Sequence, residues 1–282
     1  MTYYLEQSNW RNMANVPEGM VLAMTQDVER LNLVILPALD KIDLTEQVIV
    51  DAGCGTGAIG LHALEKGAKY VYFLEQDPQM LHILYNTLPK IVDENKFSII
   101  PKDIEHLTED DFSQMPTLVT SEFYGPTLFD EGIVPYVRRF KSLFPNIKFI
   151  PENYETRIYL GDVDFSHPVW PADDKMYEQY KFMYSEKGFA QIPDFFWPEN
   201  ARLQNKITYS ANDDLFFHAQ RFEHQGKEQY VYCQNAILSH GNEQCFNYYG
   251  WYLPPSDTTV TYQVKISIDR ETAWQPMLDK IG

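Results

Sequence analysis

The sequence predicts an α/β fold in which a parallel sheet with helices on both faces precedes a second, antiparallel β domain. Two observations support this prediction. Residues 48–150 alternate short apolar strands with amphipathic helices, which is the order of elements that builds a parallel sheet. From Pro151 onward the chain is rich in Tyr, Phe and Trp and carries short alternating stretches, which are typical of antiparallel strands.

The segment before the sheet, residues 1–46, is expected to be helical. Apolar residues recur along it at steps of three and four, which is the spacing of one helix face. This apolar stripe contains Met20, Met24, Val28, Leu31 and Ile35. Pro37 is expected to end or kink the helix, because proline lacks the backbone N–H that continues it.

Residues 47–150 carry the alternation that predicts the parallel sheet. Helices are expected after the glycine-rich turn that ends at Gly57, and again in two later amphipathic stretches at 78–90 and 131–144. Strands are expected in four apolar stretches at 47–52, 69–75, 97–104 and 117–123, and again in the stretch NIKFIPENYETRIYL at 146–160.

Residues 151–282 form the second expected domain. The segment 172–187, ADDKMYEQYKFMYSEK, is its main helical candidate. Antiparallel strands are expected in five alternating stretches at 154–163, 206–211, 229–238, 244–253 and 259–268.

The composition excludes several classes of protein. An apolar share of 44% in 282 residues is enough for a real core, so disorder is not expected. No stretch of 18 uncharged apolar residues is present, so we expect no membrane span, and the first residues lack the features of a secretory signal. Three widely spaced cysteines make neither a disulfide framework nor a zinc pattern, so we expect no metal and a reducing, cytoplasmic setting.

The charge balance bears on the partner. With 23 basic and 40 acidic residues the net charge is −17, which argues against binding nucleic acid, since that requires Lys and Arg to neutralise phosphates. The same charge favours a cationic substrate or partner through long-range attraction. Acidity that serves solubility alone is the alternative.

A glycine-rich turn, VDAGCGTG, lies where the first strand ends and a helix begins. It contains Asp51, Gly53, Gly55 and Gly57, and glycines there allow a sharp turn and a close approach of a ligand. Glu75 ends the next strand, where a carboxylate can accept both hydroxyls of a ribose. The spacing differs from the dinucleotide pattern G-x-G-x-x-G and lacks the Lys of a phosphate-binding loop.

A second unusual stretch, SEFYGPTLFDE, follows the apolar strand that begins near residue 117. It sets Glu122 and Glu131 nine residues apart in an aromatic loop. Because ligands of open α/β sheets bind at the carboxyl ends of the strands, this loop and the glycine-rich turn are expected at the same sheet edge.

These motifs resemble one family. The glycine-rich turn looks like the first motif of the class I S-adenosylmethionine (SAM) methyltransferases. Together with SEFYGPTLFDE and FIPENYETRIYL it resembles the protein arginine methyltransferases, in the same order and at near-matching spacings. That family has two glutamates nine residues apart, as Glu122 and Glu131 are, and a helix pattern Met-x-x-Asp-x-x-Arg that matches Met24, Asp27 and Arg30.

The resemblance covers residues 20 to about 160. It implies a Rossmann-like SAM-binding domain at 47–150, capped by the helical segment 1–46 and followed by a β-barrel-like domain at 151–282. It also implies that the helical candidate 172–187 serves as a dimerisation arm, so a homodimer is expected.

The resemblance implies SAM as the cofactor. Arg30 would pair with its carboxylate, Glu75 would hold its ribose hydroxyls, and one carboxylate of the stretch Asp103-Ile104-Glu105 would reach its adenine. The glycine-rich turn would form the part of the site that approaches the cofactor most closely. The implied cofactor-binding residues are Arg30, Asp51, Gly53, Gly55, Gly57, Glu75, Asp103, Ile104 and Glu105.

The resemblance assigns Glu122 and Glu131 the catalytic role of clamping a guanidinium, and the chemistry agrees. A guanidinium offers five N–H donors in a planar fork, and carboxylates accept two at a time. Its pKa above about 12 prevents a glutamate from deprotonating it in the ground state. Orientation and electrostatic preference for one nitrogen are therefore the expected contributions.

The sequence departs from the family at a late strand. Where the family carries Thr-His-Trp beside its active site, this chain carries Gln244-Cys245-Phe246. The histidine of the family pairs with the aspartate that matches Asp27, and His240 is the nearest histidine in this sequence that can replace it.

Three functions remain open on the sequence. The leading one is SAM-dependent N-methylation of a guanidinium nitrogen, with an arginine-containing protein or peptide as the cationic substrate. The second is methylation of a small guanidine or amine metabolite, which the short second domain and the missing Thr-His-Trp favour. The third is a catalytically weak, regulatory SAM-binding relative, which the retained Glu122 and Glu131 argue against.

Overall fold

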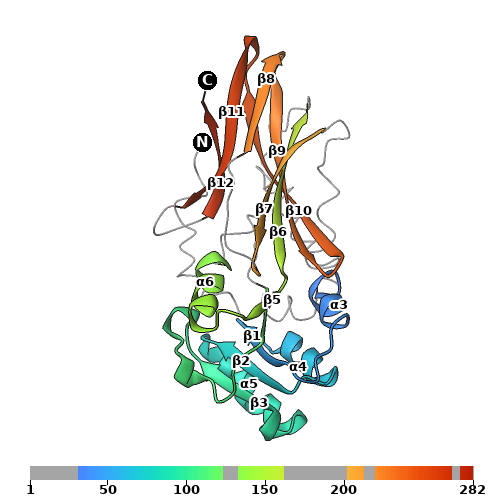
Figure 1. Cartoon of the computed structure of the whole chain (residues 1–282), viewed down its shortest axis with the longest axis vertical. Helices are drawn as coiled ribbons and strands as arrows, with labels where there is room; N and C mark the ends of the chain where they lie inside the picture. Colours follow the sequence, from blue (N-terminus) through green and yellow to red (C-terminus); the bar gives the residue numbers. More distant parts are fainter. Residues whose placement is uncertain (1–30, 123–132, 162–201, 213–219, 269–273, 282) are drawn as a thin grey trace.

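The computed structural model describes residues 31–122, 133–161, 202–212, 220–268 and 274–281. Figure 1 shows a parallel sheet with its helices at one end of the molecule and long antiparallel strands at the other. The parallel strands lie in the order β3-β2-β1-β4-β5, so the strand order reverses between β1 and β4. Their bounds are Val48–Ala52 for β1, Tyr70–Glu75 for β2, Phe97–Pro101 for β3, Leu118–Ser121 for β4 and Lys148–Ile150 for β5.

The two central strands, β1 and β2, are buried along their whole length. This is the pattern of parallel strands covered on both faces, and it explains why their sequences read as continuous apolar runs. The register sets Ala52 of β1 opposite Leu74 of β2 and opposite Ser121 of β4. The residues that follow these strands therefore emerge at one edge of the sheet, the edge formed by the carboxyl ends of the strands.

Helices follow the strands as predicted. Helix α5 carries Met80, Leu84 and Leu88 buried on one face at steps of four, and the Asp77 carboxylate caps its first turn by accepting hydrogen bonds from Gln79 N and Met80 N. The helix bounds are Ile35–Leu39 for α3, Ala58–Glu65 for α4, Pro78–Ile91 for α5 and Ile133–Leu143 for α6, with short 3₁₀ turns at Glu94–Lys96 (η2), Ile104–His106 (η3) and Glu109–Asp111 (η4).

The prediction that the N-terminal helix ends or kinks at Pro37 was wrong, because the interruption lies before this residue. The turn lies at residues 32–34, and Pro37 lies inside α3. Proline is tolerated there because it is the third residue of the helix, where its missing N–H has no partner within the helix to lose. Of the expected apolar stripe, Leu31 and Ile35 are buried in the core, and Met20, Met24 and Val28 lie outside the described part of the chain.

The antiparallel half contains two sheets in the described part of the chain. One has the order β10-β9-β6-β7 and the other β12-β11-β8. Strand β8, QRFEHQG, was not predicted, because its only buried side chains are Phe222 and His224. The bounds are Asn153–Gly161 for β6, Arg202–Ser210 for β7, Gln220–Gly226 for β8, Gln229–Ser239 for β9, Asn242–Leu253 for β10, Ser256–Ile268 for β11 and Trp274–Lys280 for β12.

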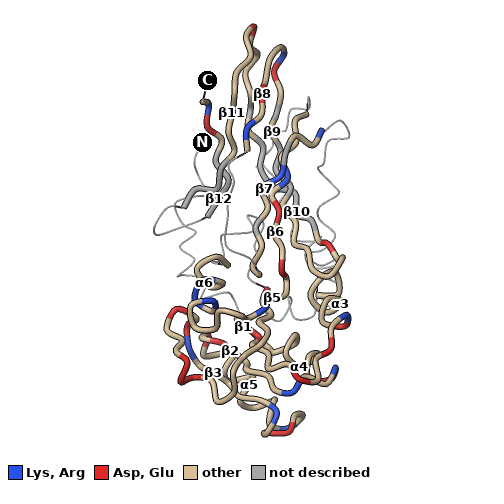
Figure 2. Tube along the Cα trace, viewed as in Figure 1, with Lys and Arg blue, Asp and Glu red and all other residues tan. Residues whose placement is uncertain are grey.

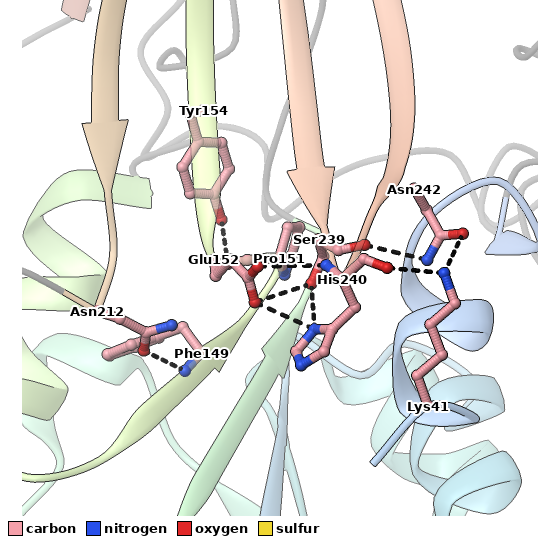
Figure 3. Close-up of polar contacts among 9 residues, drawn as sticks. All are labelled: Lys41, Phe149, Pro151, Glu152, Tyr154, Asn212, Ser239, His240 and Asn242. Carbon is pink, nitrogen blue, oxygen red and sulfur yellow. Dashed lines mark hydrogen bonds and ion pairs between the residues drawn. The ribbon is translucent and has the colours of Figure 1, made fainter.

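Polar contacts join the two halves where β5 passes into β6 (Figure 3). The Glu152 carboxylate lies 3.1 Å from His240 Nδ1 and accepts a hydrogen bond from His240 N at 3.2 Å. Lys41, just after α3, donates to the His240 carbonyl at 2.7 Å and to Asn242 Oδ1 at 3.1 Å. The tight turn between β9 and β10 is thus held against the parallel half from two sides.

Charged residues of the parallel half lie mostly on its loops and helix ends, while its strands are largely uncharged (Figure 2). The short turns after β3 carry a run of acids at Glu109, Asp110 and Asp111. Among the described residues, no helix is both long enough and apolar enough to cross a membrane.

Candidate active site at the carboxyl ends of the parallel strands

The glycine-rich turn connects β1 to α4 in a conformation that requires glycine. Gly53, Gly55 and Gly57 have φ angles of 60°, 54° and 84°, in the left-handed region where side chains are strained. At Gly57 a Cβ would also lie 3.0 Å from Phe73 Cε1. The three glycines therefore satisfy a backbone demand, and their lack of side chains leaves the backbone of the turn open to a ligand.

Gly60 is a fourth glycine whose lack of a side chain the packing beside the turn requires, and sequence reasoning missed it. It lies in the first turn of α4, and a Cβ there would lie 2.5 Å from Phe73 Cε1 and 3.0 Å from Asp51 Oδ2. Its N–H donates to Asp51 Oδ2 at 2.8 Å. A glycine inside a helix costs about 1 kcal/mol relative to alanine, so its presence there was an available signal of close packing.

Asp51 lies beneath the turn, inside the protein. It is 1% exposed, and its Oδ1 is buried with no hydrogen-bond partner in the described part of the chain. The pKa of this carboxyl is raised to about 7. Burial is the main cause, the charge of Glu75 adds to it, and the hydrogen bond from Gly60 partly offsets both by lowering the pKa. Through its hydrogen bond to Gly60, Asp51 holds the first turn of α4, which directly follows the glycine-rich turn.

Glu75 ties the end of β2 to the same turn. Its Oε2 accepts a hydrogen bond from Gly55 N at 2.8 Å, and its Oε1 accepts from Gln76 N at 2.7 Å and Asp77 N at 2.9 Å. A carboxylate has about four acceptor positions, two on each oxygen. Both acceptor positions of Oε1 are used and one of Oε2 is used, so Glu75 can accept one more hydrogen bond, at Oε2. A single hydroxyl group could donate it.

The stretch Asp103-Ile104-Glu105 follows β3 at the same edge, where Pro101 pairs with Glu75. The Asp103 carboxylate caps the turn η3 by accepting from Glu105 N at 2.8 Å, and Ile104 packs against the core. The Glu105 side chain is exposed. Of the two carboxylates, the one of Asp103 is therefore fixed in position by a backbone hydrogen bond, and the one of Glu105 extends into solvent.

Glu122 follows directly on Ser121, the last residue of β4, and is partly buried. Ser121 lies opposite Ala52, so Glu122 and Gly53 leave neighbouring strands at one edge. The remaining predicted residues, Arg30 and Glu131, lie outside the described residues. The described site thus joins the glycine-rich turn, Glu75 and Glu122, as the sequence predicts for one sheet edge.

The late strand that departs from Thr-His-Trp is β10. Gln244 is 3% exposed, pairs with Ile237 of β9, and neither oxygen nor nitrogen of its amide has a hydrogen-bond partner among the described residues. His240 lies beside Glu152, as described above. Its proposed partner Asp27 lies outside the described residues.

Cys54, the cysteine whose side chain the structure describes, is not activated as a thiol, and the described side chains include no cluster arranged to bind a metal. Burial, with the charges of Asp51 and Glu75, raises the pKa of the Cys54 thiol well above its ordinary value, which keeps it protonated. No group of three or more His, Cys, Asp or Glu side chains in these ranges is arranged to hold a metal ion.

No protein-family model matches the chain. Part of the sequence is similar to curated ribosomal protein L11 methyltransferases: it is 31% identical over 100 residues to that of Psychrobacter cryohalolentis and 34% identical over 101 residues to that of Colwellia psychrerythraea. These matches cover 35% and 34% of this chain. The chain spans about a third of the length of the curated relatives it matches, 32% and 34% respectively.

The whole chain is similar to solved structures of protein arginine methyltransferases. A structure of the Trypanosoma brucei PRMT1 enzyme-prozyme complex with AdoHcy matches with a TM-score of 0.59 at 15% identity, covering 95% of each chain. Arabidopsis thaliana protein arginine methyltransferase 10 matches with a TM-score of 0.58 at 11% identity, covering 96% of this chain and 99% of that one. The chain therefore has the fold of the protein arginine methyltransferases, a Rossmann-like parallel sheet followed by an antiparallel β domain.

Proposed function

We propose that this chain is a SAM-dependent methyltransferase that acts on a guanidinium nitrogen, with arginine in a protein or peptide as the substrate. The observation that carries the proposal is the common edge of the sheet, where the glycine-rich turn and Glu122 leave neighbouring strands. Ligands of open α/β sheets bind outside the carboxyl ends of the strands where the strand order reverses, which here is between β1 and β4. The similarity to known methyltransferases in both sequence and fold supports it.

The residues present fit SAM. Glycines with left-handed φ leave the turn open, and Glu75 Oε2 has room for a further donor such as a ribose hydroxyl. Arg30 would pair with the carboxylate of the cofactor, and Asp103, Ile104 and Glu105 would border its adenine. When bound, SAM supplies an electrophilic methyl group on a sulfonium centre.

The role of the protein in the transfer is to bind and orient the guanidinium. The carboxylates of Glu122 and Glu131 would hold it from two edges and leave one nitrogen facing the methyl group. Two carboxylates close together repel each other, so a cationic ligand is favoured at this position. As the lone pair of the attacking nitrogen forms the new N–C bond, that nitrogen gains positive charge and becomes more acidic than before, so one of its protons leaves during or after methyl transfer.

Incubation with radiolabelled SAM and three substrate pools tests the proposal. The pools are cell lysate, an Arg-Gly-rich peptide and free guanidines, and we expect label in arginine of the first two. Label confined to lysine or hydroxyl groups would contradict the proposal. Glu122→Gln and Glu131→Gln should each abolish turnover and leave SAM affinity unchanged, whereas Glu46→Gln, at an exposed residue of the turn before β1, should change neither.

A small guanidine or amine metabolite is the second candidate substrate. The observation that favours it is the buried Gln244 at the place of the Thr-His-Trp segment, which changes one wall of the expected substrate site. Label in free guanidines, with none in the peptide or lysate proteins, would select this candidate.

We further propose that the chain acts in the cytoplasm as a homodimer. The structural relatives include a heterotetrameric complex, which supports assembly as a property of the fold. Light scattering at several protein concentrations tests the homodimer, and a monomer at all of these concentrations would contradict it.

A further inference from the structure

The loop that follows β3 forms a small closed unit around Asp103. Lys102, at its start, forms an ion pair with Asp111, near its end. The Asp111 carboxylate also accepts a hydrogen bond from Thr108 N at 2.8 Å. The 3₁₀ turn η3 lies between these residues and begins directly after Asp103. The ends of the loop are thus joined, and the direction of the Asp103 side chain depends on how η3 is held.

Both ends of η3 are capped. At its amino end, Asp103 Oδ1 accepts a hydrogen bond from Glu105 N at 2.8 Å. At its carboxyl end, Leu107 is buried and its carbonyl accepts a hydrogen bond from the Arg139 guanidinium of α6. Carbonyls at the end of a helical turn have no partner within the turn, so a donor from elsewhere is needed where they are shielded from water. Asp103 and Arg139 therefore hold the same turn from opposite ends.

Arg139 reaches η3 from a helix that is anchored in the core. Val137 and Phe140, its neighbours on α6, are fully buried. Helix α6 packs against η3. Phe144, the residue after α6, also makes an edge-to-face contact with Phe112 at the end of the loop, with ring centroids 5.2 Å apart. The helix is therefore a fixed support for this loop.

Packing alone does not explain an arginine at position 139. The side chain is partly buried, and its Nε is buried with no hydrogen-bond partner in the described part of the chain. Burial of an unmatched N–H group costs free energy, and an apolar side chain would avoid this cost. The hydrogen bond to the Leu107 carbonyl is the contact that an apolar side chain could not make.

We propose that Arg139 is a positioning residue for the Asp103 carboxylate, and through it for recognition of the adenine of the cofactor. The inference rests on the proposed function, in which this stretch borders the adenine of SAM. The loop starts beside the expected ribose ligand, because Pro101 pairs with Glu75. Asp103 Oδ1 caps η3, so Oδ2 is the oxygen that would accept a hydrogen bond from the adenine N6 amino group. Without the Arg139 contact, η3 should loosen and the Asp103 side chain should lose its direction.

Calorimetric titration of the full chain with two ligands tests the inference. The ligands are S-adenosylhomocysteine (SAH) and S-inosylhomocysteine, whose base carries an O6 acceptor in place of the N6 amino donor. We expect the wild type to bind SAH more tightly, because O6 cannot donate to a carboxylate. Arg139→Met, which keeps a long apolar stem, should lower this preference by about tenfold. Arg138→Met, at an exposed neighbour on the same helix, should keep it.

A double variant separates positioning from a general loss of stability. Asp103→Asn should lower the preference for SAH by itself, because an amide can present an N–H donor to O6. If Arg139 acts through Asp103, adding Arg139→Met to Asp103→Asn should change the preference by less than twofold. A merely structural role of Arg139 would lower the melting temperature and weaken both ligands equally, which leaves the ratio of their affinities unchanged.

Four results would overturn the inference. Equal affinity of the wild type for the two ligands shows that no carboxylate recognises N6. A preference in Arg139→Met within twofold of the wild type shows that Arg139 does not position the carboxylate. An equal loss of preference in Arg138→Met shows a general effect of charge on α6. Multiplying losses in the double variant show that Arg139 and Asp103 act separately.

Two features keep the experiment decisive. If Arg139→Met fails to fold, Arg139→Gln, which keeps a polar but shorter side chain, is measured in its place and should show the same loss of preference. The titrations need no methyl acceptor. A wild type that prefers SAH but methylates no guanidine therefore overturns the proposed function and leaves the role of Arg139 standing, so the two failures are distinguishable.

Discussion

Asp51 and Gly60 form a contact that satisfies only half of a buried carboxylate. Asp51 Oδ2 accepts a hydrogen bond from Gly60 N at 2.8 Å, while Oδ1 is buried with no partner among the described residues. A buried acid in this state favours its protonated form, and its pKa is raised to about 7. The support beneath the glycine-rich turn is therefore sensitive to pH near neutrality.

Asp51→Asn should stabilise the protein at neutral pH. Between pH 4 and 7 the folded wild type binds more protons than the unfolded chain, so the free energy of unfolding that Asp51 contributes falls as pH rises and is constant above pH 7. Asparagine removes this dependence. The stability gained by the variant over the wild type should grow from pH 4 to pH 7, by an amount on the order of a few kcal/mol, in urea unfolding.

Asp43→Asn provides a control of opposite sign. Hydrogen bonds from Thr45 lower the pKa of Asp43, so its contribution to stability is present above the pKa of the unfolded chain and is lost as the pH falls. That variant should lose stability relative to the wild type at neutral pH and approach it in acid. A parallel trend in both variants would contradict the assignment to Asp51.

Gly60→Ala should destabilise the fold despite the higher helix propensity of alanine. The added Cβ would lie 2.5 Å from Phe73 Cε1, a distance at which the ring must shift. Overpacking of this kind costs about 1–3 kcal/mol, which exceeds the gain of about 1 kcal/mol from alanine in a helix. Phe73→Leu in the same background should recover part of the loss. If the losses of stability from Gly60→Ala and from Phe73→Leu simply add in the double variant, as measured by denaturant unfolding, the steric explanation is wrong.

Glu75→Gln should weaken SAM binding by tenfold or more. The two oxygens of Glu75 accept three backbone N–H groups, from Gly55, Gln76 and Asp77. A glutamine has one oxygen and one NH₂ group, so at least one backbone donor would face another donor, and the turn would be distorted. Calorimetric titration with SAM measures the effect. The exposed Glu46→Gln should bind like the wild type, and equal affinity in both variants would contradict this role of Glu75.

Gln244→Leu should stabilise the protein by about 1–3 kcal/mol. Both polar atoms of the Gln244 amide are buried with no hydrogen-bond partner in the described ranges, and removing such a group removes its desolvation penalty. Asn235→Leu is the matched change at a satisfied amide, because Asn235 Oδ1 accepts from Thr156 Oγ1 at 2.8 Å, and it should destabilise. Thermal unfolding of the two variants should therefore shift in opposite directions. A loss of stability in Gln244→Leu would show that the amide has a partner in the folded protein.

The sequence by itself determined the features that depend on local spacing. The alternation of apolar strands and helices from residue 48 to 150 predicts the parallel sheet, and the glycines of the turn predict a backbone that only glycine adopts. The composition change at Pro151 predicts the antiparallel half. Even the common edge for Glu75 and Glu122 follows from sequence, because the carboxyl ends of parallel strands lie together.

Only the tertiary structure decided which distant residues meet. His240 lies beside Glu152, Lys41 beside Asn242, and Gly60 against Phe73, and no period of the sequence relates the members of these pairs. Each contact depends on strand register and on the angle at which one element crosses another. Strand β8 was missed for the same reason: its residues are mostly polar, and its pairing with β11, more than its own pattern, makes it a strand.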